Sequence, residues 1–180
     1  MTPTPGFVIP IWALIAVCSA ASIGIIALCL YFWRQAKAMD ALWLPLSRLS
    51  IPSVRYLSVV PITEAKLADA VERAFHAMAV AGPWDTDKLR AALAGLRIQI
   101  NPVESWEARC IEQGCTPPRV AGQALVEVKT IAVGPSLAAL AHEACHVAEY
   151  VLDGFVDYQH SGWERRGLYA VCNAYQGGNT

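Results

Sequence analysis

The pattern H-E-x-x-H at residues 142–146 constrains the fold and chemistry of this chain more than any other feature of its sequence. Two histidines four residues apart lie one above the other on an α-helix, so that His142 and His146 can hold one metal ion together. Glu143 lies on the adjacent side of the same helix, where its carboxylate can act on water at that ion. The pattern therefore predicts a helix here and a Zn²⁺ site that supports hydrolysis.

The residues around the pattern agree with this prediction. Residues 124–133 are rich in β-branched side chains and predict one strand. Ser136 is placed to cap a helix that begins at Leu137, and Gly154 is a typical helix stop. We therefore expect the histidines in the middle of a helix that directly follows a strand. The structural alternative is a helix that carries two histidines on a polar face and binds no metal.

A catalytic zinc site needs a third protein ligand in addition to the two histidines of the pattern. His160 is the first candidate, because a chain that reverses at Gly154 can bring it back to the metal. Glu164 is the alternative third ligand. Asp153 and Asp157 are less favoured, since acidic residues in short turns usually cap the backbone.

Glu149 lies on the same helical face as both histidines of the pattern. We expect it to accept a hydrogen bond from an imidazole N–H rather than to bind the metal itself.

Three pieces of this segment carry a family resemblance: H-E-A-C-H at 142–146, Gly154, and H-S-G-W at 160–163. Together they resemble the SprT-like zinc metallopeptidases, whose active helix is followed by a glycine and by a third histidine in an H-G-x-x-W-like segment. The resemblance covers residues 124–167, and Trp163 falls one residue closer to the histidine than in the family pattern. It implies His142, His146 and His160 as zinc ligands and Glu143 as the general base. We find no Cys-rich zinc ribbon, so it implies only a minimal zincin core of the phage or bacterial type.

These residues predict a zinc metallopeptidase that hydrolyses peptide bonds, with Glu143 accepting a proton from water and returning it to the leaving amine. The strand that ends at Val133 is expected to offer an edge to an extended peptide substrate. Candidate oxyanion donors are Tyr150, Tyr158 and Tyr169. The competing interpretation is a non-catalytic, membrane-anchored zinc-binding or accessory protein of a phage or envelope complex.

The N-terminal part of the chain carries no charged residue from position 7 to position 33. Such a segment is long enough to cross a hydrocarbon layer of ~30 Å. No Lys or Arg precedes it, which argues against a cleaved signal peptide. We therefore predict a single transmembrane anchor over residues 1–33. Arg34 and Lys37 follow it, and by the positive-inside rule the C-terminal domain is expected in the cytoplasm.

The remaining chain predicts one α+β domain. Prolines among apolar and basic residues indicate a membrane-proximal linker over residues 34–60, and a zincin-like domain follows over residues 61–180. Within it we expect helices over 63–81, 86–94 and 164–175, and a strand over 96–100 that pairs with the strand over 124–133.

The charge balance bears on the binding partners, and the cysteines bear on possible disulfides. Acidic residues outnumber basic ones over residues 61–180 and no basic stripe is visible, so binding of nucleic acid is disfavoured. Cys110 and Cys115 enclose a short loop that an oxidising compartment could close as a disulfide, and the sequence leaves this open.

Overall fold

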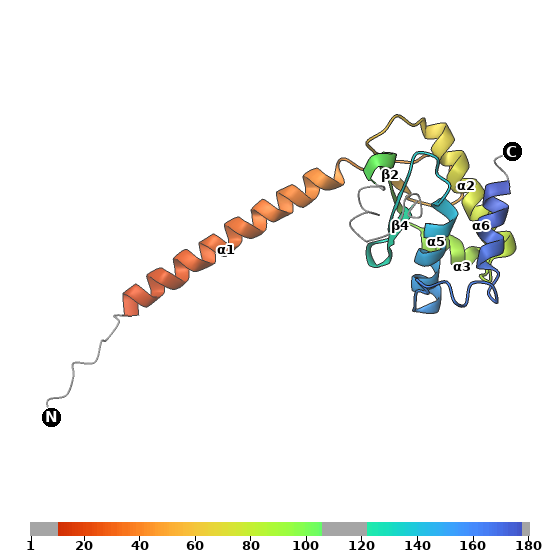
Figure 1. Cartoon of the computed structure of the whole chain (residues 1–180). Coiled ribbons are helices and arrows are strands. Elements are labelled where there is room, and N and C mark those ends of the chain that lie inside the picture. Colours follow the sequence, from red (N-terminus) through yellow and green to blue (C-terminus); the bar gives the residue numbers. More distant parts are fainter. Residues whose placement is uncertain (1–10, 106–121, 178–180) are drawn as a thin grey trace, which may run out of the picture. The chain divides into compact units, whose positions relative to one another are not determined.

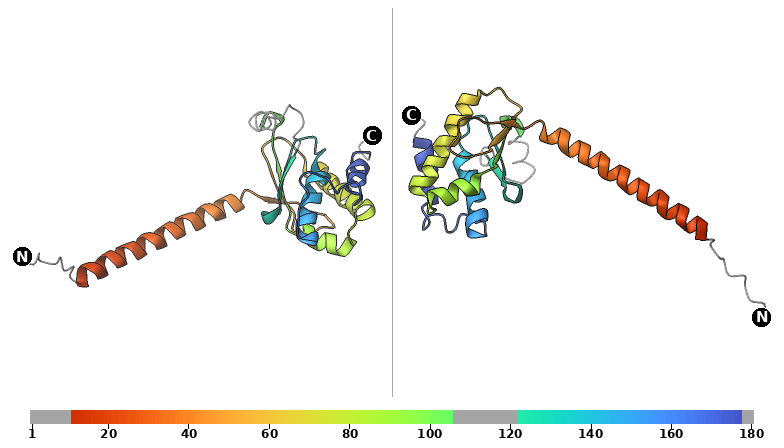
Figure 2. Two further views of the ribbon diagram at one scale, coloured as in Figure 1. Left: turned by 60° about the horizontal axis from the view of Figure 1, so that its bottom comes forward. Right: turned by 180° about the vertical axis from the view of Figure 1, so that it is seen from behind.

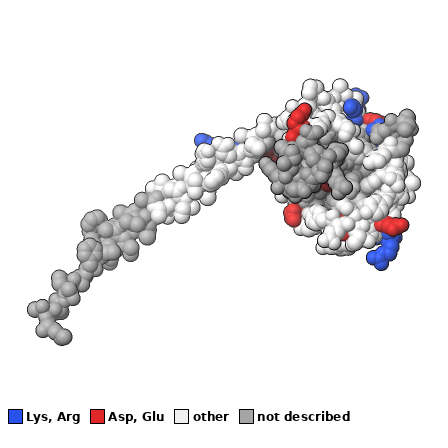
Figure 3. All heavy atoms as spheres, viewed as in Figure 1, with Lys and Arg blue, Asp and Glu red and all other residues white. Residues whose placement is uncertain are grey.

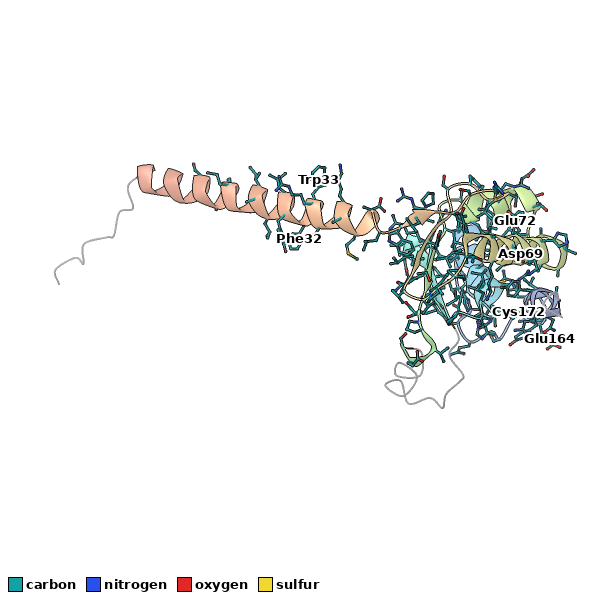
Figure 4. All side chains as sticks on the ribbon, turned by 90° about the horizontal axis from the view of Figure 1, so that it is seen from above. Phe32, Trp33, Asp69, Glu72, Glu164 and Cys172 are labelled. Atoms are coloured by element: carbon teal, nitrogen blue, oxygen red, sulfur yellow. The ribbon has the colours of Figure 1, made fainter. Side chains whose placement is uncertain are left out.

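The computed structural model describes residues 11–105 and 122–177, and its contacts divide the chain into two units, Met1–Leu42 and Trp43–Thr180. The first unit contains helix α1 (Ile11–Asp40), in which apolar side chains such as Phe32 and Trp33 project outward (Figure 4). Within the described ranges, no helix combines the length and the apolarity that crossing a membrane requires. The predicted anchor over residues 1–33 begins outside these ranges.

The second unit contains a mixed five-stranded sheet in the order β1-β2-β3-β5-β4. Its strands are β1 (Leu44–Pro45), β2 (Arg55–Ser58), β3 (Arg97–Ile100), β4 (Gly122–Leu125) and β5 (Thr130–Val133). The three central strands, β2, β3 and β5, run parallel, and β1 and β4 are antiparallel to their neighbours. The predicted α+β class is confirmed, as is the pairing of the strand near residue 98 with residues 130–133.

Helices cover one side of this sheet (Figures 1 and 2). They are α2 (Glu64–Ala81), α3 (Thr86–Leu93), α5 (Leu140–Ala148) and α6 (Leu168–Gly177). Helix α5, which carries the H-E-x-x-H pattern, contacts β4 and β5 on one side and α2, α3 and α6 on the others. The pattern therefore lies on a helix that is enclosed by the sheet and by three other helices.

Helix α2 shows how the sequence builds the core. The Thr63 hydroxyl accepts a hydrogen bond from the backbone N–H of Lys66 at 3.3 Å, and the helix ends before Gly82, as the sequence predicts. Its buried residues recur at helical spacing: Leu67, Ala70, Val71, Ala74, Phe75, Ala77 and Met78. They pack with Ile98 and Ile100 of β3 in one core cluster. Each large apolar side chain buried in this way contributes roughly 1.5–3 kcal/mol.

The structure differs from the prediction of a linker over residues 34–60. This range includes β1 and β2, and Leu46, Ile51 and Val54 are buried in the core. Pro45 ends β1 and Pro52 lies in the turn before β2, so neither marks an unstructured connection. The sheet therefore begins well before residue 61.

The prediction of one strand over residues 124–133 is also corrected. A short 3₁₀ turn, η1 (Val126–Val128), separates β4 from β5, and Lys129 adopts a left-handed backbone with φ 48°. The segment is therefore an antiparallel hairpin. Consequently β5 lies inside the sheet, and β4, not the strand ending at Val133, is at an edge among the described strands.

The helix of the pattern begins later than expected. Leu137 has φ 59°, which belongs to a turn, and Ala139 occupies the cap position without a side-chain hydrogen bond. At the other end α5 continues into a wider π-helical turn, η2 (Glu149–Asp153), and stops at Gly154 with φ 74°, as predicted. Helix α6 likewise begins at Leu168, so that Glu164 lies in a turn.

Candidate metal centre

Three imidazoles meet at one point beside α5. His142 and His146 come from the helix itself, and His160 comes from the turn that follows it. One ring nitrogen from each lies within 4.8 Å of the others. The Nε2 atoms of His146 and His160 are 3.2 Å apart. Two nitrogens that each lie 2.0–2.1 Å from a tetrahedral zinc ion are separated by about 3.3 Å, so this pair already has the spacing of two zinc ligands.

A tight turn presents His160 to the other two histidines. Its backbone is left-handed, with φ 57°. The N–H of His160 donates to the carbonyl of Asp157 at 3.0 Å, and the Asp157 carboxylate accepts the N–H of Gly162 at 2.7 Å. This last hydrogen bond is the main cause that lowers the pKa of Asp157. Asp157 therefore caps the turn that carries the third histidine, as expected for an acidic residue in a turn.

Trp163 forms the wall behind all three imidazoles. Its side chain is completely buried, and its ring centroid lies 4.8 Å from His142, 4.9 Å from His146 and 4.3 Å from His160. A rigid aromatic surface of this size restricts the ring orientations of the three histidines together. In the sequence, Trp163 was indicated only by the family resemblance, as the tryptophan that follows His160.

His142 and His146 are held in the neutral form that binds metals. Burial, with a smaller contribution from His160, lowers the pKa of His142 to about 4. Burial, followed by the charges of the two other histidines, lowers the pKa of His146 to about 3. At neutral pH both imidazoles therefore offer a lone pair without first losing a proton.

Glu143 is confined between α5 and β4. Its side chain is buried, and burial raises its pKa to about 7. A Cβ atom added at Gly122 of β4 would lie 2.6 Å from both Cγ and Oε1 of Glu143. The carboxylate therefore fills the space that a side chain on Gly122 would need. A carboxyl group with a pKa near neutrality can both accept and return a proton.

The Nδ1 atoms of His146 and His142 both have partners within the domain. Nδ1 of His146 lies 3.3 Å from Oε2 of Glu149, as the sequence analysis expected of an imidazole partner. Nδ1 of His142 lies 4.0 Å from the sulfur of Cys172 in α6. Sequence reasoning assigned Cys172 no role, because only the packing of α6 against α5 brings it to the site.

The other candidate residues are not part of the group of three histidines. Glu164 is exposed at the periphery of the domain (Figure 4), and it is not part of the metal-binding group found among the described residues. Of the tyrosines, Tyr158 has its ring 5.4 Å from that of His146, whereas the Tyr169 hydroxyl donates to the carbonyl of His160 at 3.5 Å. Tyr150 is exposed. The Cys110–Cys115 loop lies outside the described residues.

The arrangement is consistent with a zinc site of the H-E-x-x-H type: three imidazoles that could hold one metal ion, with a buried glutamate on the same helix. On the face shown in Figure 3, the described acidic and basic side chains are interspersed and form no basic stripe. Comparison of the chain with models of known protein families, with curated proteins and with solved structures gives no match.

Proposed function

We propose that this chain is a zinc-dependent metallopeptidase in which His142, His146 and His160 hold the ion and Glu143 is the general base. The observation that supports it is the meeting of three imidazole nitrogens within 4.8 Å of one another beside a buried glutamate on the same helix. When bound at such a site, Zn²⁺ acts as a Lewis acid that acidifies water and polarises a carbonyl. The resemblance to SprT-like peptidases remains part of this proposal.

Glu143 carries the proton in this reaction. Its carboxylate accepts a proton from the attacking water and donates it to the nitrogen of the departing amine, so that it ends in its starting state. Its pKa near 7, caused by burial, suits both transfers. Tyr158 is the best placed of the predicted oxyanion donors, since its ring lies beside His146.

The substrate in this proposal is an extended peptide that adds to the edge of the sheet along β4. Gly122 at the start of β4 approaches Glu143, so a peptide paired with this strand would run past the proton acceptor. The location at a membrane, with the domain in the cytoplasm, is a separate proposal that depends on residues 1–33.

Zinc binding and peptide cleavage by the Glu143→Gln variant test the proposal. We expect the full chain to bind about one zinc ion and to cleave casein or a peptide library. The variant should keep the zinc and lose hydrolysis, because Glu143 acts on water without binding the metal. Glu104→Gln, at an exposed glutamate in another segment, is the matched control and should keep both properties.

Equal activity in Glu143→Gln would refute the peptidase proposal. Zinc binding without any cleavage by the wild type would instead favour the non-catalytic accessory protein.

A further inference from the structure

We propose that Glu149 and Arg166 form a positioning pair that fixes the orientation in which His146 binds a metal ion. The inference rests on the metal site of the proposed function but not on its catalytic activity. Glu149 lies in the π-helical turn after α5, and Arg166 lies in the turn before α6.

The first step is the burial of Glu149. Its side chain has no exposed surface, yet its two oxygens have polar partners in three separate segments. Their partners are Nδ1 of His146 at 3.3 Å, the donating backbone N–H of Asp157 at 3.4 Å and the donating Nη1 of Arg166 at 2.5 Å. A buried carboxylate is costly unless it is paired and hydrogen-bonded in this way, so the position of Glu149 is closely determined.

The second step concerns the two nitrogens of His146. In its ion pair with Arg166, Glu149 is a carboxylate that accepts hydrogen bonds, so we assign Nδ1 of His146 as the donor in their contact. Nε2 then carries the free lone pair, and it is this atom that lies 3.2 Å from Nε2 of His160. The pair with Glu149 therefore selects the tautomer and the ring orientation that suit a metal ligand.

The third step is the anchoring of Arg166. Its second amino group, Nη2, forms an ion pair with Asp153, whose carboxylate also accepts the indole N–H of Trp84 at 3.2 Å. Its guanidinium also lies 5.1 Å from the centre of the Phe155 ring. A guanidinium that bridges two carboxylates, one at each amino group, is a rigid support. It ties Glu149 to the segment between α2 and α3.

Metal affinity of the full chain tests the inference. Glu149→Gln keeps the shape of the side chain but removes its charge, and Arg166→Met removes the support. We expect each to weaken zinc binding by about 10- to 100-fold, measured by competition with a chelator. Each should also change the visible spectrum of bound Co²⁺, which reports ligand geometry. Arg165→Met changes an exposed neighbour of the same type and should alter neither property.

Imidazole NMR of the zinc-loaded wild type provides a measurement that does not depend on the folding of a variant. Nδ1 of His146 should carry a proton that exchanges slowly with solvent, and Nε2 should be the metal-bound nitrogen. The inference is overturned if Nδ1 binds the metal. It is equally overturned if folded Glu149→Gln keeps wild-type zinc affinity and the wild-type Co²⁺ spectrum.

Both readouts concern metal binding alone. A wild type that binds zinc but cleaves no peptide would refute the proposed activity, while the loss of affinity in Glu149→Gln would still support the positioning pair.

Discussion

His160 is the residue that converts a pair of histidines on a helix into a three-ligand site. Its left-handed backbone, with φ 57°, is a conformation that costs a non-glycine residue of the order of 1–3 kcal/mol, and the hydrogen-bonded turn from Asp157 holds it there. A strained backbone conformation of this kind persists only where the surrounding structure holds it in place. At His160 this conformation directs the imidazole toward His146.

We therefore expect His160→Ala to lower zinc affinity by more than the roughly 10- to 100-fold that loss of an outer partner costs, because it removes a direct ligand. Peptide cleavage should be lost as well. Isothermal titration with zinc and a cleavage assay on the full chain measure the two effects. Glu164→Ala is the control, since Glu164 is exposed and outside the histidine cluster. The opposite ranking of the two variants would make Glu164 the third ligand.

Gly122 is a second residue with a specific role, because the absence of a side chain there leaves room for the side chain of Glu143. We expect Gly122→Ala to leave the fold and zinc binding nearly intact, because the atoms that its new methyl group meets belong to the flexible side chain of Glu143. That side chain must move to make room, so peptide cleavage should fall at least about tenfold, which corresponds to about 1.4 kcal/mol in the barrier. Gly24→Ala, where a Cβ meets nothing within 4 Å, is the matched control. Full activity in Gly122→Ala would show that the position of Glu143 does not limit the reaction.

The sequence predicted the grouping of His142, His146 and His160 because helical spacing and a short return of the chain are local properties. The close approach of Gly122 to Glu143 and of Cys172 to His142 could not be predicted in this way. Both depend on which elements pack against α5, and the packing is set by the whole core rather than by neighbouring residues.

At the scale of elements, the caps at Thr63 and Gly154 were predictable, whereas the start of α5 and the breaks inside regular-looking segments were not. Thr63 and Gly154 have the conformations that their residue types favour at helix ends. Residues 124–133 read as one strand because β-branched residues favour extended backbone on both sides of a turn, and the turn at Lys129 contains neither glycine nor proline. The π-helical turn that directs Glu149 inward likewise has no distinctive sequence signature.

The predicted membrane anchor overlaps helix α1. We expect residues 1–33, fused to a soluble reporter, to carry it into the membrane fraction and to resist extraction with carbonate, because residues 7–33 have no charge. The same fusion with two arginines in place of Ile25 and Ile26 is the control and should remain in the supernatant. Recovery of the unmodified fusion in the supernatant would contradict a membrane anchor.

At the scale of the whole molecule, the sheet decides where the domain begins. Strand β2 pairs with β3 in parallel, residue for residue from Arg55 against Arg97 to Ser58 against Ile100. Parallel strands need a crossover, which α2 and α3 provide. The segment of residues 34–60 contains prolines and basic residues, and its composition resembles that of a linker. Composition cannot reveal a strand whose partner lies some forty residues further along the chain.

We therefore expect a fragment of residues 43–180 to fold and bind zinc, and a fragment of residues 61–180 to fail in both. The shorter fragment loses Leu46, Ile51 and Val54, which are at most 7% exposed. At roughly 1.5–3 kcal/mol for each buried side chain, the loss of three side chains is about 4.5–9 kcal/mol, which is comparable to the entire 5–15 kcal/mol by which domains are usually stable. It also leaves one edge of β3 without its partner strand.

Urea unfolding followed by circular dichroism measures this difference directly. The fragment of residues 43–180 should unfold in one cooperative transition whose midpoint rises when zinc is added, because the ion binds only the folded form. The fragment of residues 61–180 should show no such transition. A cooperative transition at the same midpoint in both fragments would mean that β1 and β2 are dispensable. The metal centre would then be supported by the helices α2, α3, α5 and α6 and the strands β3, β4 and β5 without the first two strands.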